Sequence, residues 1–378
     1  MPLVWLALFL TTPLWLMAAL AMLLGFPSWH GKLAALWTLL PLLSFWLARS
    51  RPRWAALVAG VAACGLLGFL TVYPFPKKDQ AVSTSAPFPT LLDRLCNFVP
   101  ERDLSALGVG MAYSGADYDR LVGLLSPLYN EMAADPMYDR LPHVVGSTAT
   151  DLFTGRPGKA HYFSYTPPDT KALQGKRPAL FFYHGALGNF TVYLHFWRRW
   201  AEQRGWIVVC PSNGFGRWYD AKGEKRALEL FDQALQELPI DPSRVMVVGM
   251  SNGATAATRL TNQRTASVGG LLLVCPVLEV GQTLTPTFLA WTHEHPSPIV
   301  LEGTDDINVS PAVVGPNVEA ILENGGRCDY LLLDGHDHHL LFSAEAEITK
   351  AADLIAEELE KKNGATSNSP QTEKKAKQ

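Results

Sequence analysis

The sequence predicts an α/β fold in which helices flank a mainly parallel sheet, preceded by a helical membrane region. Two observations support this prediction. Uncharged apolar runs crowd the first 75 of the 378 residues, and such runs are long enough to span a bilayer. From about residue 158, short apolar segments alternate with longer segments of helical apolar spacing. Strands that alternate with helices form parallel sheets covered on both faces.

Three uncharged apolar runs predict three transmembrane helices within residues 1–75: Leu3–Phe26, Leu33–Ala48 and Trp54–Tyr73. For the first run, the rival interpretation is a cleaved signal peptide. That run lacks a basic n-region, exceeds the length of an h-region and is followed by further apolar runs. We therefore expect a transmembrane helix there, and the lipid bilayer is an expected partner.

Basic residues orient this membrane region. The link between the second and third runs holds three arginines: Arg49, Arg51 and Arg53. Because basic residues favour the cytoplasmic side, the N-terminus is expected inside and everything after Tyr73 outside. Lys32, Lys77 and Lys78 then lie outside, so the numbers of basic residues on the two sides of the membrane are nearly equal. The expectation is an integral protein of the cell membrane, with its folded domain on the outer or periplasmic side.

The rest of the chain divides into a linker, a helical lead-in, an α/β domain and a disordered tail, at residues 76–89, 90–157, 158–360 and 361–378 respectively. The linker is rich in Pro, Ser and Lys. Pro100, Pro127 and Pro136 interrupt the helical spacing of the lead-in. The tail is polar and has no apolar period, which is typical of disorder.

Within the α/β domain, seven short apolar segments are predicted strands: His161–Tyr165, Ala179–Tyr183, Trp206–Cys210, Val245–Val248, Leu271–Cys275, Ile299–Leu301 and Tyr330–Leu333. Helical spacing between them is clearest at Leu194–Gln203 and Lys225–Leu238. Only about twenty residues separate Cys275 from Ile299, which leaves no room for a large helical cap. In the loop Gly214–Asp220, Trp218 and Tyr219 either line a substrate pocket or pack beneath it.

Composition narrows the possible partners. The chain has 32 basic and 35 acidic residues, a formal net charge of −3 and no basic stripe, so nucleic acid is not expected as a partner. Of its five cysteines, the four that follow Cys64 are compatible with disulfides in an oxidising compartment. Cys210 and Cys275 end strand-like runs, however, where buried free thiols are commoner. No CxxC or Cys/His spacing indicates zinc, and neither a metal nor a cofactor is expected.

The strongest local signal lies in residues 244–253. An apolar strand runs into Gly249-Met250-Ser251-Asn252-Gly253, and an amphipathic stretch, Ala254–Leu260, follows. This pattern predicts a strand, a turn too tight for side chains at its first and last positions, and a helix. In such an elbow the central serine has a strained backbone and exposes its hydroxyl above the sheet edge. Ser251 is therefore the candidate nucleophile.

A serine nucleophile needs a base and a carboxylate, which should follow later strands at the same sheet edge. Asp305 and Asp306 follow the predicted strand at Ile299–Leu301, and Asp306 is the preferred acid. The alternative is that both acids only cap a helix. Three histidines follow the last strand, and His336 and His338 are the candidate bases. A metal-binding tract is the rival interpretation of these histidines.

Backbone N–H groups are expected to hold the oxyanion. Gly185 allows the chain to turn after the strand that ends at Tyr183, so that the N–H of Ala186, or of Leu187, points at the developing charge. The N–H of Asn252 supplies the second donor. His184 is expected to be a structural hydrogen-bonding group rather than a base.

The chain order is therefore Ser, Asp, His, with an oxyanion loop upstream, and residues 158–358 resemble the α/β-hydrolase fold. Ile240-Asp241-Pro242-Ser243-Arg244-Val245, leading into the elbow, is similar to polyhydroxybutyrate-depolymerase-like and feruloyl-esterase-like hydrolases. This resemblance implies that Ser251 is the nucleophile, Asp306 the acid and a late histidine the base. It favours His338, because an apolar residue, Leu340, follows two positions later.

The membrane region and the helical lead-in depart from that pattern, and the substrate loops match none that we can name. The expectation is a membrane-anchored serine hydrolase that cleaves small-molecule or polymeric carboxylic esters through an acyl-enzyme. An acyltransferase, thioesterase or peptidase would use the same three residues, since all share the acyl intermediate. An idle hydrolase domain acting as an interaction module is the alternative from a different class.

Overall fold

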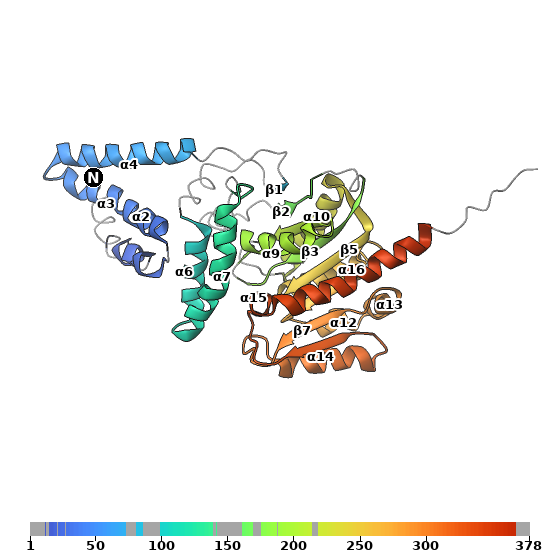
Figure 1. The fold of residues 1–378 in the computed structure, drawn as a ribbon. Coiled ribbons are helices and arrows are strands. Elements are labelled where there is room, and N and C mark those ends of the chain that lie inside the picture. The colour runs from blue at the N-terminus through green and yellow to red at the C-terminus, as the bar shows by residue number, and fades with distance from the viewer. Residues whose placement is uncertain are drawn as a thin grey trace, which may run out of the picture. The chain divides into compact units, whose positions relative to one another are not determined.

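The computed structural model describes residues 12, 15–20, 22–26, 28–72, 81–85, 99–138, 141, 161–168, 175–186, 188–213 and 218–367. These residues form two compact units (Figure 1). One comprises residues 1–159 with 190–195, and the other comprises residues 160–189 with 196–378.

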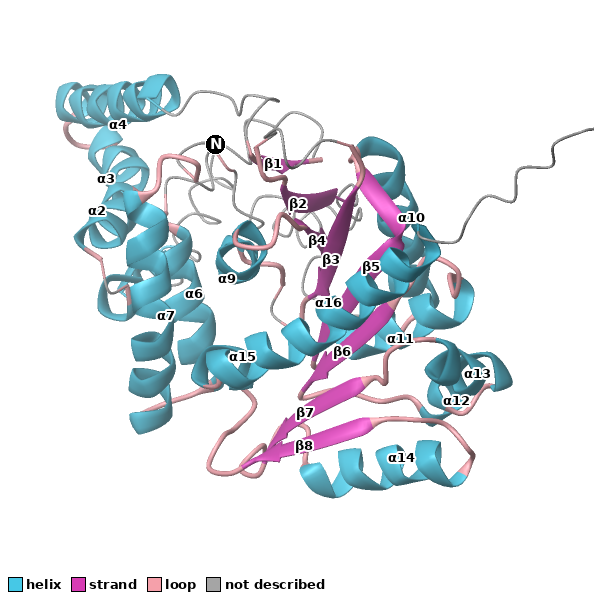
Figure 2. Cartoon of the chain, turned by 45° about the vertical axis from the view of Figure 1, so that its right-hand side comes forward, coloured by secondary structure: helices cyan, strands magenta, loops and turns pink. Residues whose placement is uncertain are grey.

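The second unit contains seven strands of a twisted sheet in the order β2-β4-β3-β5-β6-β7-β8 (Figure 2). They are β2 (His161–Tyr165), β3 (Arg177–Tyr183), β4 (Ile207–Ser212), β5 (Ile240–Met250), β6 (Gly270–Val274), β7 (Ile299–Gly303) and β8 (Asp329–Leu333). Only β2 runs antiparallel to its neighbour β4, and the pairings from β4 through β8 are parallel. This order confirms the predicted α/β-hydrolase fold.

Alternate residues of each central strand face opposite sides of the sheet, and helices cover both sides. In β3, Phe181 packs against Phe231 of α10 (Ala221–Glu237), with ring centroids 4.6 Å apart. The next residue, Phe182, points the other way and packs against Trp197 of α9 (Thr191–Glu202), at 6.0 Å. Both faces of the strand are therefore buried, which explains its uninterrupted apolar sequence.

The remaining helices continue these two layers. α11 (Gly253–Gln263), α13 (Pro286–Glu294) and α14 (Pro311–Glu323) share the apolar core on the side of α10. On the other side, the long helix α16 (Glu345–Ser367) packs closely on β6, since a Cβ at Gly270 would lie 2.3 Å from Ile355. Trp200 of α9 donates to Asp353 of α16 at 2.8 Å. Short helices α12 (Val280–Thr283) and α15 (Leu340–Ser343) complete the unit.

All seven strands predicted from the sequence are present, with ends shifted by a few residues at most positions. The segment between Cys275 and Ile299 holds only the short helices α12 and α13, so it forms no large cap, as predicted. Cys64, Cys210, Cys275 and Cys328 are free thiols, and Cys210 and Cys275 are buried. Cys96 lies outside the described residues.

The predicted tail is partly wrong. Helix α16 continues to Ser367, past residue 361, where disorder was expected to begin. An established helix extends at little cost, and Glu357 pairs with Lys361 one turn later, at 3.5 Å. The helix therefore outlasts its apolar period, which ends near Leu359. Residues 368–378 lie outside the described part of the chain.

The first unit is helical apart from one short strand, as far as it is described. It contains α2 (Trp29–Trp37), α3 (Leu39–Ala48), α4 (Pro52–Val72), β1 (Val82–Thr84), α6 (Glu101–Ala112) and α7 (Ala116–Ala134). β1 corrects the linker prediction, since Val82 is buried and the β-branched run Val-Ser-Thr suits a strand. Residues 73–80 and 86–98 are not described.

Pro127 does not interrupt the lead-in as predicted, because it lies inside α7. Leu121, Leu125 and Leu128 form a buried face along this helix, and burial of that face offsets the backbone hydrogen bond that proline removes. Pro100 and Pro136 do flank helices, since Pro100 caps α6 and Pro136 follows α7.

The stretch Trp29–Ala48, which covers α2 and α3, is long and apolar enough to cross a membrane, with a mean hydropathy of 1.4. It is the one such stretch among the described residues, and shorter apolar helices lie at Trp15–Gly25 and Pro52–Leu67. Only 22% of its most apolar window is buried, unlike a core helix. A signal sequence would meet the same test of length and composition.

A buried carboxylate fixes the start of α2 within this unit. Asp103 of α6 accepts hydrogen bonds from the backbone N–H of Ser28 at 2.9 Å and from its hydroxyl at 2.6 Å. The Ser28 oxygen in turn accepts from the N–H of Gly31 and caps α2. A Cβ at Gly31 would lie 2.5 Å from the Asp103 carboxyl, so only glycine allows this approach.

Candidate active site

The candidate nucleophile lies at a tight turn between β5 and α11. Ser251 has φ +53°, in the left-handed region that is strained for a residue with a side chain. A Cβ at Gly249 would lie 2.6 Å from Ala254, and one at Gly253 would lie 2.0 Å from the carbonyl oxygen of Tyr183. Both glycines are therefore required by close packing, which confirms the elbow predicted from the sequence.

The structure brings Ser251, His338 and Asp306 into one hydrogen-bonded chain. His338 follows β8 in the turn that leads to α15. Its Nε2 lies 3.0 Å from the Ser251 Oγ, and its Nδ1 lies 2.7 Å from Oδ2 of Asp306. In the Nδ1–H tautomer, the imidazole donates to the carboxylate and accepts from the hydroxyl. This geometry permits His338 to take a proton from Ser251.

Asp306 is held from two directions. Its Oδ1 accepts hydrogen bonds from the N–H groups of Asn308 and Val309, each at 2.8 Å. Burial alone would raise the pKa of Asp306, but the hydrogen bond from His338 and those from the two backbone groups lower it below its usual value. Asp306 therefore remains ionised beside the imidazole. Asp305 is exposed and bonds to Thr304 instead.

His336 lies close to the site but does not reach Ser251. Its Nδ1 lies 2.9 Å from the Ser343 hydroxyl, and its backbone oxygen accepts from the N–H of Asp305 at 2.9 Å. A Cβ at Gly303 would lie 2.2 Å from that same oxygen. The backbone of His336 thus packs against the end of β7, and this packing carries the chain on to His338.

The loop after β3 passes directly beside the nucleophile. A Cβ at Gly185 would lie 3.1 Å from the Cβ of Ser251, so this glycine lets the loop approach the site. Ala186 follows and is exposed. The donor roles of the Ala186 and Asn252 N–H groups stay predictions, and Leu187 lies outside the described residues.

His184 supports this loop as a neutral structural group. Its Nδ1–H donates to the carbonyl of Gly185 at 2.7 Å, and its Nε2 accepts from the N–H of Asn213 at 3.2 Å. Complete burial lowers the pKa of His184 to about 4. The imidazole therefore stays uncharged at neutral pH, and its two hydrogen bonds give it the structural role that the sequence predicts.

Trp218 packs beneath the site rather than lining it. Its side chain is fully buried, and its Nε1–H donates to the carbonyl of His184 at 2.9 Å. Its ring meets Tyr183 edge to face, with centroids 5.2 Å apart. Tyr219 is 49% exposed, so of Trp218 and Tyr219 it is the one that can contact a substrate. Residues 214–217 are not described.

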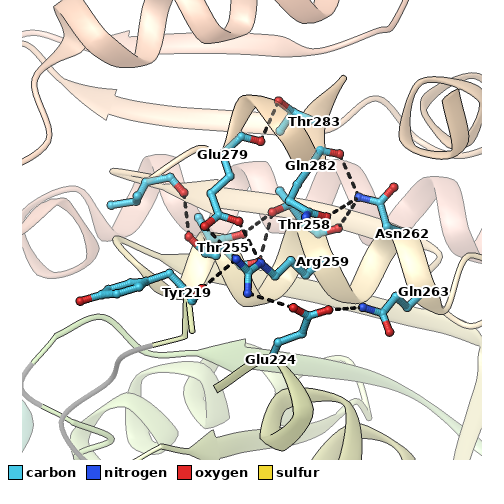
Figure 3. A network of polar contacts seen from close by, with 12 residues as sticks. Tyr219, Glu224, Thr255, Thr258, Arg259, Asn262, Gln263, Glu279, Gln282 and Thr283 are labelled. Carbon is cyan, nitrogen blue, oxygen red and sulfur yellow. Dashed lines mark hydrogen bonds and ion pairs between the residues drawn. The ribbon is translucent and has the colours of Figure 1, made fainter. Parts of the chain in front are cut away.

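A network centred on Arg259 ties the helix behind the nucleophile to two neighbouring loops (Figure 3). Arg259 of α11 binds Glu279 through two hydrogen bonds, at 2.8 and 3.0 Å, and Glu224 through a third, at 3.0 Å. It also donates to the carbonyl of Tyr219 at 2.8 Å. The loop after β6 is bound a second time, since the N–H of Val277 donates to the carbonyl of Ser251 at 2.9 Å.

Two buried groups beside Asp306 are ones that the sequence motifs do not indicate as part of the site. Glu302, in β7, is fully buried. Cys275, directly after β6, is buried and has φ +45°. The carboxyls of Glu302 and Asp306 contribute to raising the pKa of the Cys275 thiol, after the effect of burial. The available signal was a charged residue near the end of an otherwise apolar strand, Ile-Val-Leu-Glu-Gly.

Comparisons with known proteins show likeness to esterases only at a distance. No family model and no curated protein matches the sequence. A solved thermostable esterase matches over 52% of this chain and 58% of its own, with 17% identity and a TM-score of 0.43. An esterase of the planctomycete Thermogutta terrifontis with bound propionate matches over 51% and 87%, with 18% identity and a TM-score of 0.40.

A hyperthermophilic esterase of the archaeon Pyrobaculum calidifontis matches over 55% of this chain and 81% of its own, with 18% identity and a TM-score of 0.42. The chain thus spans little more than half of the first of these structures. The fold assignment rests on the sheet itself, and nothing about substrate follows from these likenesses.

The close packing of the elbow predicts a strong effect of one added methyl group. In Gly253→Ala, the new Cβ would overlap the backbone of β3, and we expect the free energy of unfolding to fall by roughly 3 kcal/mol. Gly281→Ala is the matched control, because no atom lies within 4 Å of the added Cβ. Thermal unfolding followed by circular dichroism measures both. Equal stability of the two variants would contradict this account of the elbow.

Proposed function

We propose that this chain is a membrane-anchored serine hydrolase that cleaves carboxylic esters through an acyl-enzyme. The observation that carries the proposal is the chain of hydrogen bonds from Ser251 Oγ to His338 Nε2, at 3.0 Å, and from His338 Nδ1 to Asp306, at 2.7 Å. A hydroxyl, a base and a carboxylate in this arrangement are the parts that acyl transfer by serine requires.

In the first half of the reaction, Ser251 Oγ attacks the ester carbonyl carbon while His338 Nε2 takes the hydroxyl proton. Asp306 holds the imidazole in the Nδ1–H tautomer and stabilises the imidazolium. The N–H groups of Ala186 and Asn252 hold the oxyanion. When the intermediate collapses, the bond to the alcohol oxygen breaks and His338 returns its proton to that oxygen.

In the second half, water attacks the acyl-enzyme and His338 takes its proton. The bond between the acyl carbon and Ser251 Oγ then breaks, and the proton passes to Ser251. An alcohol in place of water would give acyl transfer, so analysis of the products in the presence of added alcohols separates hydrolysis from transferase activity. The same intermediate serves thioesters and amides, which are tested by changing the substrate.

Membrane anchoring is supported by the stretch Trp29–Ala48 and by the apolar runs on either side of it. We further propose that three helices span the membrane and that residues 158–360 lie on the outer or periplasmic side, a proposal supported by the three arginines in the link between the second and third runs.

Replacing the nucleophile should abolish covalent reactivity. Ser251→Ala removes the attacking oxygen, so we expect no labelling by a fluorophosphonate probe and no burst of p-nitrophenol from short p-nitrophenyl esters. The full-length protein in detergent is used, with Ser267→Ala, in the turn after α11, as the control that should behave as the unmodified protein. Labelling that persists in Ser251→Ala would rule out this serine as the nucleophile.

The two histidine variants test which residue is the base. His338→Ala should lower kcat on the order of a thousandfold or more, because no other imidazole lies within hydrogen-bonding distance of Ser251 in the described structure. His336→Ala should lower kcat far less, since His336 bonds to Ser343 instead. Steady-state kinetics measured side by side show which of the two variants has the larger loss of kcat. A larger loss in His336→Ala would show that the proposed base is wrong.

Membrane topology is tested by reporter fusions after Lys78. We expect alkaline phosphatase to be active and a cytoplasmic reporter to be inactive at this point, because the preceding third helix should exit on the outer side. The opposite pattern would place residues 158–360 in the cytoplasm.

A further inference from the structure

Glu302 is a buried acidic residue close in sequence to Asp306, and the proposed mechanism leaves it without a role. It lies in β7, one residue before the strand ends, and it is paired in register with Leu332 of β8. Glu302 is fully buried. No ion pair joins Glu302 to a lysine, arginine or histidine in the part of the chain that the structure describes. A carboxylate without a cation is costly to bury in this way.

The two oxygens of Glu302 have different surroundings. Oε1 accepts a hydrogen bond from the N–H of Gly303 at 3.0 Å. Oε2 is buried and meets no N–H or O–H donor among the described residues. The chain turns back directly after β7, where the N–H of Asp306 donates to the carbonyl of Gly303 at 3.2 Å, and the Asp306 carboxylate acts electrostatically on Glu302. Two neighbouring carboxyl groups can share a hydrogen bond only when one of them carries a proton.

The proton belongs on Glu302. Asp306 accepts hydrogen bonds from His338, Asn308 and Val309, all of which stabilise its ionised form. Besides Asp306, the titratable groups of the described residues that interact with Glu302 are the thiol of Cys275 and the phenol of Tyr330. Burial and the neighbouring charge of Asp306 raise the pKa of Glu302 to about 8, although the N–H of Gly303 opposes this shift.

We propose that Glu302 is a positioning residue: as a neutral carboxylic acid it donates a hydrogen bond from Oε2 to Asp306 and holds that carboxylate toward His338. This proposal rests on the function proposed above, since it gives the role of Glu302 in the same reaction. The backbone N–H donors to Asp306 do not titrate, whereas Glu302 does. When Glu302 loses its proton, Asp306 loses a donor and gains a negative neighbour, and its hold on His338 weakens.

The proposal predicts different pH profiles for two variants of similar size. In Glu302→Gln, the amide oxygen accepts from Gly303 and the amide nitrogen donates to Asp306 at every pH. We expect kcat near pH 7 within about twofold of the unmodified protein, and no decline of kcat above pH 8. The unmodified protein should show that decline. In Glu302→Leu, the donor is absent, and kcat should fall about tenfold or more at unchanged KM, as expected for a lost hydrogen bond to a charged group.

Stability provides a second readout that needs no catalysis. The pKa of Glu302 is higher in the folded protein than the usual value of about 4.3 in an unfolded chain. Its contribution to stability is therefore fully present below pH about 4, is lost as pH rises, and levels off above pH about 8. Glu302→Gln has no such titration, so its Tm relative to that of the unmodified protein should rise between pH 5 and 8.

The experiment uses the full chain in detergent, with p-nitrophenyl butyrate as substrate and thermal unfolding measured across the same pH range. Glu319→Gln, the same substitution at an exposed position on α14, is the control. It should change neither the decline of kcat above pH 8 nor the Tm relative to that of the unmodified protein. The proposal is overturned if kcat of Glu302→Gln still declines above pH 8 and the Tm of this variant relative to that of the unmodified protein stays constant between pH 5 and 8. If Ser251 proves unreactive while the Tm trend behaves as expected, the proposed function fails and the proton on Glu302 stands.

Discussion

The close approach of α11 to β3 is the constraint on which the candidate site depends. Gly253 lies so near the backbone of Tyr183 that no side chain fits there, and Gly249 is equally tight against Ala254. These two contacts force the turn between β5 and α11 to be short, and Ser251 takes up the strain with φ +53°. The buried core on both faces of β3 and β5 supplies the packing energy that maintains this strained turn.

The other polar groups of the site come from the same edge of the parallel sheet. Asp306 follows β7, His338 follows β8 and the Gly185 loop follows β3. Hydrogen bonds between these loops, including one from the N–H of Asp305 to the carbonyl of His336 at 2.9 Å, keep them together. The distances between Ser251, His338 and Asp306 therefore depend on the positions of several strand ends. A change in the spacing of β7 and β8 would alter these distances, as would a change at Ser251 itself.

Two buried carboxyls beside one imidazole are an unusual arrangement for a stable core. A buried carboxylate lowers stability unless it is paired or hydrogen-bonded, and Asp306 meets that requirement through backbone donors and His338. Glu302 meets it by remaining protonated. The carboxyl end of β7 thus combines a charged acid with a neutral one, and the difference arises from the donors that each side chain can reach.

Much of this was determined by the sequence alone. Alternating apolar runs specified the seven strands, because a strand buried on both faces needs an unbroken apolar segment. The glycines around Ser251 specified the elbow, because only glycine tolerates such contacts.

The preference for Asp306 and His338 also came from the sequence, but only as one choice between neighbouring residues. Which histidine lies next to Ser251 depends on tertiary structure, since the backbone of His336 packs against Gly303 and His338 Nε2 lies 3.0 Å from Ser251 Oγ. Local patterns also missed β1, the proline within α7 and the last turns of α16, where packing and helix propagation outweigh local preference. The environment of Glu302 was likewise beyond the sequence, because the state of a buried carboxyl depends on the charges and donors that the fold brings to it.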